Sequence, residues 1–550
     1  MDCRALASHK LPHQSKLFLE YLNNFSKVQS FYAHAPTVSS VTAAARNLNF
    51  PAERRSAVAA TLRAQNAAFG AGPTAFENLD RLENGAVAIV SGQQVGLFSG
   101  PAYSFYKALS AVEVANELTR SGIEAVPVFW MATEDHDVDE VRHVSWFQDG
   151  QLKRFELPAP DEQRAGRPVG KILLGAQIDE QVHDAAELLV KQGSVLLAQF
   201  LKESYNRGET YGGAFAKLFA RLFSQQGLIL LQPLDPALHR IAAPVYRQAI
   251  EDRDVLNEKL LLRGKELEAA GFSAQVKVTA KSTLLFYMGN QCGDHAQASD
   301  GARKPIAVSG HGKFQAGEKQ WVTADLLKAI DSAPEDFSPS ALLRAVVQDY
   351  LLPTVAYIGG AAEIAYFAQS EVVYKHVLGR MPVILSRPDF TLVDIKAAKL
   401  LRAYNLKVED IWAGSQEVRR GMERASVPKD VSRGFDRNHK QVMKMLDQLH
   451  GQLQKLDPTL QGAVETARRK IEYQIDKLRR KTGRAQDAKA TLLAVYETFL
   501  EQLLYPHKVL QSRELCLLPF LARWGPGGLT ELQKLCGSKN LGRHCIVQLS

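Results

Sequence analysis

The segment AVAIVSGQQVGLFSGP (residues 86–101) joins a short apolar run to a glycine-rich loop. The apolar run at 86–90 follows the turn-forming residues Glu83-Asn84-Gly85 and has the length and composition of a buried strand. The loop ends in Pro101, a residue that fits the first turn of a helix, and apolar residues then recur on one helical face until Ser121-Gly122. The pattern predicts a strand, a glycine-rich loop and a helix.

A second apolar run, VPVFWMA at 126–132, follows this helix and is rich in β-branched and aromatic residues. A strand-helix-strand unit of this kind forms a parallel pair with a right-handed crossover. In open parallel sheets, ligands bind beyond the carboxyl ends of the strands. We therefore expect the glycine-rich loop and the acidic loop TEDHDVDE (133–140) to lie on the same rim of the sheet.

Later segments extend the same pattern. Residues 213–236 predict a helix followed by a strand, 354–369 a strand, a Gly-Gly turn and a helix, and 381–390 a further strand. The more polar stretches near 145–215 and 288–340 are predicted to be insertions. The fold class expected from these segments is α/β, with a parallel-sheet core.

The last third of the chain has a different pattern. Val442, Leu446, Leu449, Leu453 and Leu456 alternate steps of four and three, which is typical of a heptad seam. Asp457-Pro458 interrupts it, and a helical stripe resumes over 464–478. We predict an antiparallel coiled-coil hairpin that serves dimerisation or a partner. The basic run RRKTGR (479–484) fits a solvated helix face better than an RNA contact.

Composition sets further bounds on this chain of 550 residues. No apolar run approaches the roughly 20 residues of a membrane span, and the first residues resemble no signal peptide, so we expect a cytoplasmic protein. The five cysteines (Cys3, Cys292, Cys516, Cys536 and Cys545) are widely spaced and predict free, non-catalytic thiols. A net charge of +8 is a mild excess that predicts no nucleic-acid partner, although a sequence pI near 9 keeps that alternative open.

The glycine-rich loop is suited to ligand binding. Gly92, Gly96 and Gly100 would let backbone amides approach a ligand, and the helix that follows would favour an anion. Gln93 and Gln94 would offer amide groups to a polyhydroxylated substrate. The glycine spacing differs from that of a dinucleotide-binding loop and no Walker lysine follows, so a turn that only joins strand to helix is the alternative.

The acidic loop brings five carboxylates and one imidazole into residues 134–140. Carboxylates this close raise one another's pKa values and keep a neighbouring histidine protonated, so Asp135, His136 and Asp137 are candidates for general acid or base chemistry. A metal site is less favoured, since adjacent residues cannot all face one ion and the HExxH spacing is absent. Asp135 or Asp137 as a simple helix cap is the other alternative.

A second glycine pair follows a predicted strand near residue 358. Gly359 and Gly360 would also let backbone contact a ligand, with Glu363 one turn into the next helix. Close packing of that helix against the strand is an equally good explanation of the pair.

Five stretches together resemble a known family: LPHQSKLFLEYLNNF (11–25), SGQQVGLFSGPAYSFYK (91–107), VPVFWMATEDHDVDEV (126–141), LLRAVVQDYLLPTVAYIGGAAEIAYFAQ (342–369) and LYPHKVLQSR (504–513). They are similar to the cysteine-adding enzymes of bacillithiol biosynthesis, the cysteine ligases called BshC. The resemblance implies a Rossmann-like core related to class I synthetases and a coiled coil that forms a homodimer. It also implies that cysteine is joined to glucosaminyl-malate through an amide bond.

The resemblance implies a site with two walls. One wall would hold Gly92, Gln93, Gln94, Gly96, Gly100, Pro101 and Tyr103, and the other Asp135, His136 and Asp137. In this hypothesis Asp135 or His136 takes a proton from the sugar ammonium, while the loop amides hold malate or an activating phosphate. The sequence has no HIGH or KMSKS motif, so the activating cosubstrate, ATP or another nucleotide, stays open.

We expect four segments along the chain. They are an N-terminal helical segment at 1–80 that packs on the core, a Rossmann-like core at 81–395, a helical coiled-coil domain at 396–515, and a C-terminal helix and tail at 516–550, with GSKNLGRHCIVQLS in the tail. Two other functions stay open: a different α/β synthetase or transferase that joins an amine and an acid, and a non-catalytic coiled-coil dimer scaffold.

Overall fold

A parallel sheet lies at the centre of the molecule in the computed structural model, which describes residues 3–159, 166–289, 301–425, 429–484 and 487–549. Its five strands, in spatial order, are β13 (Val383–Ser386), β12 (Thr354–Gly359), β2 (Val87–Gln93), β3 (Ala125–Met131) and β6 (Ile229–Leu231). Every neighbouring pair is parallel. The predicted α/β class with a parallel-sheet core is confirmed.

The strand order reverses between β2 and β12. The chain builds β2, β3 and β6 outward on one side, then returns to add β12 and β13 on the other. At such a reversal, the loops that leave two neighbouring strands run in opposite directions and open a crevice beyond the strand ends. The crevice lies between residues that follow β2 and residues that follow β12.

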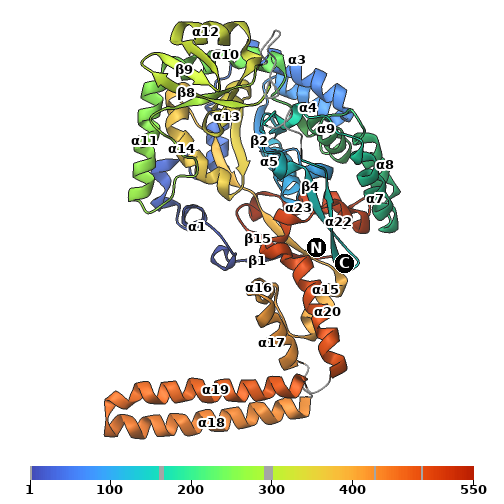
Figure 1. The fold of residues 1–550 in the computed structure, drawn as a ribbon, viewed down its shortest axis with the longest axis vertical. Coiled ribbons are helices and arrows are strands. Elements are labelled where there is room, and N and C mark those ends of the chain that lie inside the picture. The colour runs from blue at the N-terminus through green and yellow to red at the C-terminus, as the bar shows by residue number, and fades with distance from the viewer. Residues whose placement is uncertain (1–2, 160–165, 290–300, 426–428, 485–486, 550) are drawn as a thin grey trace.

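Helices cover the parallel sheet on both faces (Figure 1). The helix predicted after the glycine-rich loop is α5, which packs against β2 and β3. The helices of this core are α3 (Ala52–Phe69), α4 (Pro73–Glu83), α5 (Tyr103–Arg120), α9 (Tyr211–Leu222), α10 (Pro236–Glu251), α11 (Arg253–Ala269), α13 (Ala341–Leu351) and α14 (Ala361–Val377). Before them come β1 (Cys3–Leu6), α1 (Lys16–Asn23) and α2 (Val38–Arg46).

Two groups of elements are inserted between the core strands. The first contains α6 (Val138–Val141), the hairpin of β4 (His143–Gln148) and β5 (Gln151–Glu156), the 3-10 helix η5 (Val169–Lys171), α7 (Gln177–Lys191) and α8 (Val195–Ser204). The second is an antiparallel sheet of β7 (Ser282–Tyr287), β8 (Lys304–Gly310), β9 (Lys313–Ala316), β10 (Lys319–Val322) and β11 (Phe337–Pro339), together with α12 (Thr323–Ser332).

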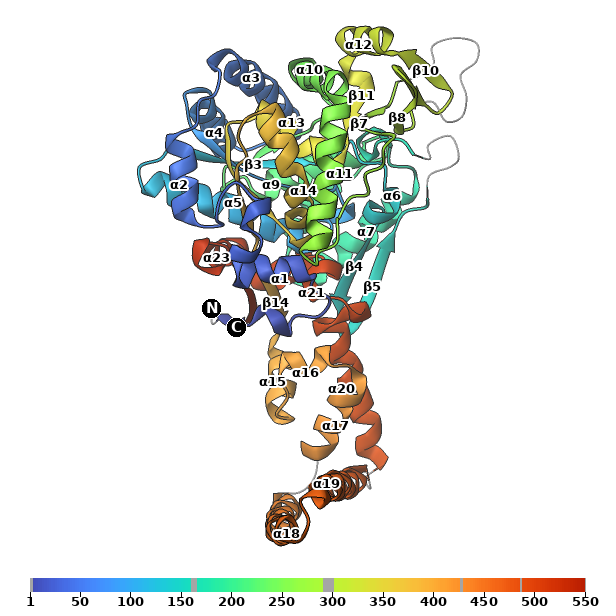
Figure 2. The ribbon, with the colours of Figure 1, turned by 90° about the vertical axis from the view of Figure 1, so that its left-hand side faces the viewer.

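A helical arm projects from the core and ends in a long hairpin that runs across its axis (Figures 1 and 2). The arm contains α15 (Ile395–Ala403), α16 (Val408–Trp412), α17 (Ser415–Ala425) and α20 (Asp487–Leu504), and the hairpin is α18 (Lys429–Leu456) and α19 (Gln461–Arg484). Arg479 bonds to Asp436 across the hairpin at 3.0 Å. The predicted coiled-coil hairpin is confirmed, including its turn at Pro458–Leu460.

The C-terminal stretch 537–549 is folded, so our expectation of a tail there was wrong. After α21 (Gln511–Glu514), α22 (Leu518–Trp524) and α23 (Gly528–Leu535), the chain forms β15 (His544–Gln548). This strand lies between β1 and β14 (Asp389–Val393), and the three strands form a separate sheet. The run HCIVQ is too short to predict a strand alone, and its partners lie far away in the sequence.

None of the described cysteines forms a disulfide bond, and Cys516, Cys536 and Cys545 are buried. Cys292 lies outside the described residues. Within the described part of the chain, no helix has both the length and the apolarity that a bilayer crossing requires.

Candidate active site

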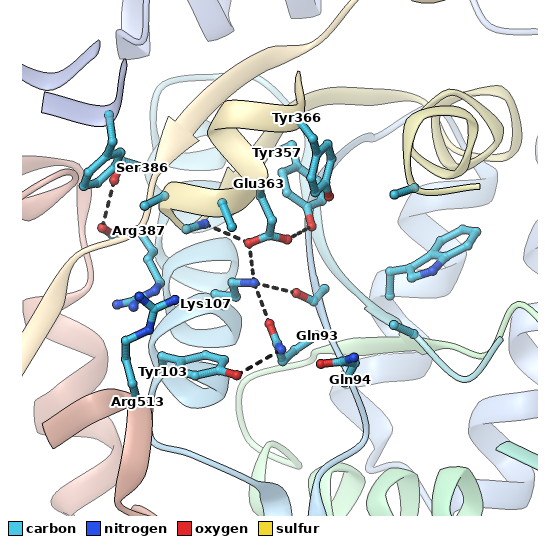
Figure 3. A pocket seen from close by; sticks show the side chains of 18 of the residues that line it. Gln93, Gln94, Tyr103, Lys107, Tyr357, Glu363, Tyr366, Ser386, Arg387 and Arg513 are labelled. Carbon is cyan, nitrogen blue, oxygen red and sulfur yellow. Dashed lines mark hydrogen bonds and ion pairs between the residues drawn. The ribbon is translucent and has the colours of Figure 1, made fainter. Parts of the chain in front are cut away.

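A cavity of about 530 Å³ lies at the carboxyl ends of the core strands, beside the crevice between β2 and β12. Its walls come from distant parts of the chain: Phe18 in α1, Gln93 at the end of β2, Arg344 in α13, Glu363 in α14, and Arg513 near the C-terminus. Figure 3 shows several of these side chains converging on one volume. The topology therefore places a ligand-sized cavity where an open parallel sheet is expected to bind ligands.

Lys107 connects the two sides of the cavity (Figure 3). It lies in the first turns of α5, is buried, and donates from Nζ to the carbonyl of Gly92 at 2.9 Å and to Oε1 of Gln93 at 2.7 Å. Its ammonium also pairs with Glu363, which follows β12. Gln93 is held from its other end by a hydrogen bond from Nε2 to the Tyr103 hydroxyl at 3.1 Å.

Glu363 is fixed by three kinds of partner. Its carboxylate accepts the backbone amide of Gly360 at 2.8 Å and the hydroxyl of Tyr357 at 2.5 Å, besides the charge of Lys107. Burial would raise its pKa, but the lysine charge and these hydrogen bonds outweigh burial and lower the pKa below its ordinary value. The predicted second glycine turn thus holds an ionised, largely buried carboxylate, 16% exposed, against the glycine-rich loop.

The acidic loop after β3 forms the next part of the rim. Asp135 accepts a hydrogen bond from Nε2 of Gln94 at 2.8 Å, which joins the loop after β2 to the loop after β3. The loop backbone is held by η5, because the amides of Val169 and Gly170 donate to the carbonyls of Asp135 and Thr133. The expected meeting of the two loops on one rim is therefore seen in the structure.

The candidate residues divide into two groups. Seven line the cavity: Gly92, Gln93, Gln94, Tyr103, Asp135, Gly360 and Glu363. Five do not: Gly96, Gly100, His136, Asp137 and Gly359.

The distal half of the glycine-rich loop is part of the core. Leu97 and Phe98 are fully buried, and the amides of Gly96 and Gly100 donate to carbonyls within the loop itself. Gly100 has a φ of +67°, and a Cβ at Gly96 would lie 2.8 Å from the Cα of Gly100. Both glycines therefore have a conformational explanation in the tight turn that leads into α5.

His136 and Asp137 face a separate surface pocket, with Asp135 between that pocket and the cavity. Asp137 accepts the amide of Glu140 at 3.2 Å and caps the short helix α6. His136 Nδ1 lies 3.7 Å from Oδ1 of Asp135 and 43% of its side chain is exposed. Among the described residues, no three His, Cys, Asp or Glu side chains gather closely enough to hold a metal ion.

Sequence patterns missed the cationic wall of the cavity. Arg344, Arg387, Arg513 and Arg543 all line it. Arg344 and Arg513 lie in two of the stretches that carry the family resemblance, but no spacing or cluster marks any of the four as a ligand-binding residue. In the described part of the chain, the guanidinium groups of Arg513 and Arg543 have no hydrogen bond or ion pair, while Arg387 pairs with Asp389 at 2.7 Å. Only the fold brings these positive charges together.

Glu134 is a further cavity residue whose position the sequence patterns did not predict. It belongs to the acidic loop, but it lines the cavity and only 7% of its side chain is exposed. Its burial contrasts with that of Asp135, whose side chain is 35% exposed.

The sheet order and the cavity at its reversal point define a Rossmann-like protein with a small-molecule site. Comparison with known proteins agrees. The family model described as the N-terminal Rossmann-like domain of bacillithiol biosynthesis BshC matches residues 1–388, and that of the BshC C-terminal coiled-coil domain matches residues 390–549.

Three curated relatives span nearly the same length and share one name, "Putative cysteine ligase BshC". The protein from Koribacter versatilis is 41% identical over 525 residues, which cover 95% of each chain. That from Solibacter usitatus is 37% identical over 96% of each chain, and that from Chlorobaculum tepidum 32% identical over 92% of this chain and 91% of its own. The chain belongs to the BshC family of bacillithiol biosynthesis.

Proposed function

We propose that this protein is a cysteine ligase that joins cysteine to glucosaminyl-malate through an amide bond, in the cytoplasm. The single observation that carries the proposal is the cavity at the sheet reversal, which is lined by carboxylates such as Asp135 and by two arginines without a described partner, Arg513 and Arg543. One substrate carries an ammonium group and a dicarboxylate, and these two kinds of side chain match its charges. Family membership supplies the reaction class.

The arginine wall suits the malate part of the substrate. Arg513 and Arg543 line the cavity and have no other described partner, so both remain able to pair with carboxylates. Guanidinium groups bind carboxylates through two parallel hydrogen bonds, which fixes orientation as well as charge. In this proposal the two arginines bind malate and direct the sugar toward the acidic loop.

The opposite wall would receive the sugar. Asp135 attracts the glucosamine ammonium, and Gln93 and Gln94 present amide groups to the sugar hydroxyls beside it. Lys107 and Glu363 keep Gln93 in place, with Gly92, Tyr103 and Gly360 completing the wall. His136 and Asp137 would act indirectly, by shaping the loop that carries Asp135.

Thiol analysis in a bacterium tests the function and the role of Asp135 together. The host is a bacillithiol-producing species from which its own cysteine ligase has been removed, and it receives the wild-type chain, Asp135→Asn or Asp139→Asn. We expect the wild type to restore bacillithiol and Asp135→Asn to lower its rate of accumulation about 10- to 100-fold, the usual cost of losing a charged hydrogen bond. Mass spectrometry measures both bacillithiol and glucosaminyl-malate.

Asp139→Asn is the matched control, because Asp139 is a carboxylate of the same loop that is 79% exposed and pairs with Arg142 outside the cavity. It should accumulate bacillithiol like the wild type. Persistent glucosaminyl-malate with a well-expressed, folded wild-type protein would contradict the proposed function and favour a different α/β synthetase.

The exposed apolar side chains of the helical hairpin support a homodimer. Met445, Leu449 and Leu456 lie on one stripe of α18 and are 66%, 45% and 78% exposed. A pair of helices buries little apolar surface by itself, and a long coiled hairpin commonly completes its core against another chain. We propose that a second copy of this chain covers the stripe.

A further inference from the structure

Glu134 is a buried carboxylate in the cavity wall whose hydrogen-bonding capacity is not used. Its side chain is 7% exposed, and its Oε1 has no hydrogen-bond partner in the described residues. Burying a carboxylate oxygen without a partner is costly, and native proteins seldom do so without a reason. Oε1 faces His239 behind the wall, whereas the second oxygen, Oε2, is not fully buried and has no hydrogen bond among the described residues. Glu134 lines a cavity of about 530 Å³, so a ligand group in that cavity is the natural partner of Oε2.

The side chains behind Glu134 form a short polar chain into the core. His239 of α10 has its Nε2 3.6 Å from Oε1 of Glu134, and its Nδ1 lies 3.2 Å from the hydroxyl of Tyr246. Burial lowers the pKa of His239 to about 4, so the imidazole is neutral near pH 7. His239 therefore supplies no positive charge that would fix Glu134 in its ionised form.

The charges that face Glu134 are mostly positive, but burial outweighs them. Arg303, Arg344 of α13 and Lys171 of η5 favour its ionised form, whereas the neighbouring carboxylate of Asp135 opposes it. Arg303 and Arg344 direct their hydrogen bonds elsewhere, Arg303 to Ser338 and Arg344 to Tyr366. Burial is the largest effect and raises the pKa of Glu134 to about 7, so the group exchanges a proton at neutral pH.

We propose that Glu134 is the general base of this site and takes a proton from the ammonium group of the bound substrate. This inference rests on the proposed function. One N–H bond of the ammonium breaks, its electron pair stays on nitrogen, and an O–H bond forms on the Glu134 carboxylate. The neutral amine then has the free electron pair that amide formation requires, and Glu134 later returns the proton to water in the cavity. Asp135, at the more exposed mouth, holds the ammonium by charge.

The first test measures proton transfer without the activation chemistry. Purified full-length protein is titrated with glucosaminyl-malate by calorimetry, in buffers of different ionisation enthalpy, on both sides of pH 7. We expect the wild type to take up or release protons when it binds glucosaminyl-malate. The number of protons exchanged should change with pH around an apparent pKa near 7. Glu134→Gln should lose this exchange while its affinity changes less than about tenfold, because glutamine keeps the shape but cannot titrate.

The second test uses the bacterial thiol assay. Glu134→Gln should lower the rate of bacillithiol accumulation about 100-fold or more, the usual contribution of a general base. Glu134→Asp keeps the titrating group but withdraws it by one methylene, so it should retain proton exchange and lose part of the rate. The thermal midpoints of both variants are measured first, and Glu134→Asp carries the test if Glu134→Gln does not fold.

The outcomes separate the two proposals. If the wild-type chain makes no bacillithiol, the proposed function fails. If the wild type makes bacillithiol and Glu134→Gln makes it at the same rate, only the role of Glu134 is overturned. A loss of affinity beyond tenfold in Glu134→Gln, with unchanged proton exchange, would overturn the base role and assign Glu134 to substrate binding.

Discussion

Lys107 and Glu363 form a buried ion pair that holds the loop after β2 against the start of α14. The lysine side chain is 4% exposed and the glutamate side chain 16%, so neither charge is well hydrated. Removing one member of a buried ion pair leaves an uncompensated charge, which usually costs more than the pair itself contributes. The two residues should therefore be strongly coupled in stability.

A double-mutant cycle measures this coupling. We expect Lys107→Met to lower the free energy of unfolding by about 3–5 kcal/mol, because it leaves the Glu363 carboxylate buried without its counter-charge. Lys107→Met combined with Glu363→Gln should be more stable than the sum of the single changes predicts, since neither charge then remains. Urea unfolding of the four proteins gives the coupling energy.

The exposed pair Lys534 and Glu531 provides the control for this cycle, because both side chains face solvent. Lys534→Met should leave the urea midpoint unchanged. Strict additivity of Lys107→Met and Glu363→Gln would show that the two charges do not depend on each other. Because the pKa of Glu363 is lowered in the folded state, its contribution to stability should be present above about pH 4.5 and lost as the pH falls further.

At the scale of elements, local patterns predicted the segments that form the site most successfully. The strand, loop and helix at 86–120 follow from an apolar run, a glycine-rich turn and a 3.6-residue period, all within neighbouring residues. The following strand β3 was equally clear. The role of Gly96 and Gly100 could not be predicted in the same way. A tight turn and a ligand-binding loop both require glycine, so the residue type does not distinguish between them.

The strand β15 shows what such patterns miss. It is short, but it lies between β1 and β14 and fully buries Val547. Val547→Ala removes two methyl groups from a packed position and should lower the free energy of unfolding by about 2 kcal/mol. Chemical denaturation measures the change.

Gln548→Ala is the matched control in the same strand, because that side chain is exposed and its loss should have little effect on the unfolding midpoint. Equal midpoints for Val547→Ala and the wild type would mean that β15 contributes no packing energy. In that case residues 544–548 would behave as the tail that we first expected.

At the scale of the whole molecule, the arm and the core have different tasks. The core holds the cavity, whereas the hairpin of α18 and α19 lies at the far end of the arm (Figure 1). The proposed dimer contact therefore lies away from the site. Oligomeric state and substrate binding should be separable by substitution.

Met445→Glu combined with Leu449→Glu tests the dimer, because two charges on the exposed stripe of α18 would have to be buried against the partner. We expect a shift from dimer to monomer in sedimentation velocity, with unchanged affinity for glucosaminyl-malate. Lys440→Gln combined with Gln454→Glu, on another face of α18, makes the same change in net charge and should remain dimeric. A dimer that survives both pairs of substitutions would place the interface elsewhere.

The sequence by itself determined the elements that depend on neighbours along the chain. The apolar runs of the sheet, the glycine-rich turn, the acidic loop and the periodic helical hairpin can all be recognised from neighbouring residues. Tertiary structure alone decided which residues meet in the cavity. Arg513 and Glu134 lie far apart in the sequence and share no motif, and the fold brings them to one cavity. The direction of a side chain and its burial depend on those distant contacts. The arginines of the cavity and the buried carboxylate of Glu134 could therefore be recognised only in the folded structure.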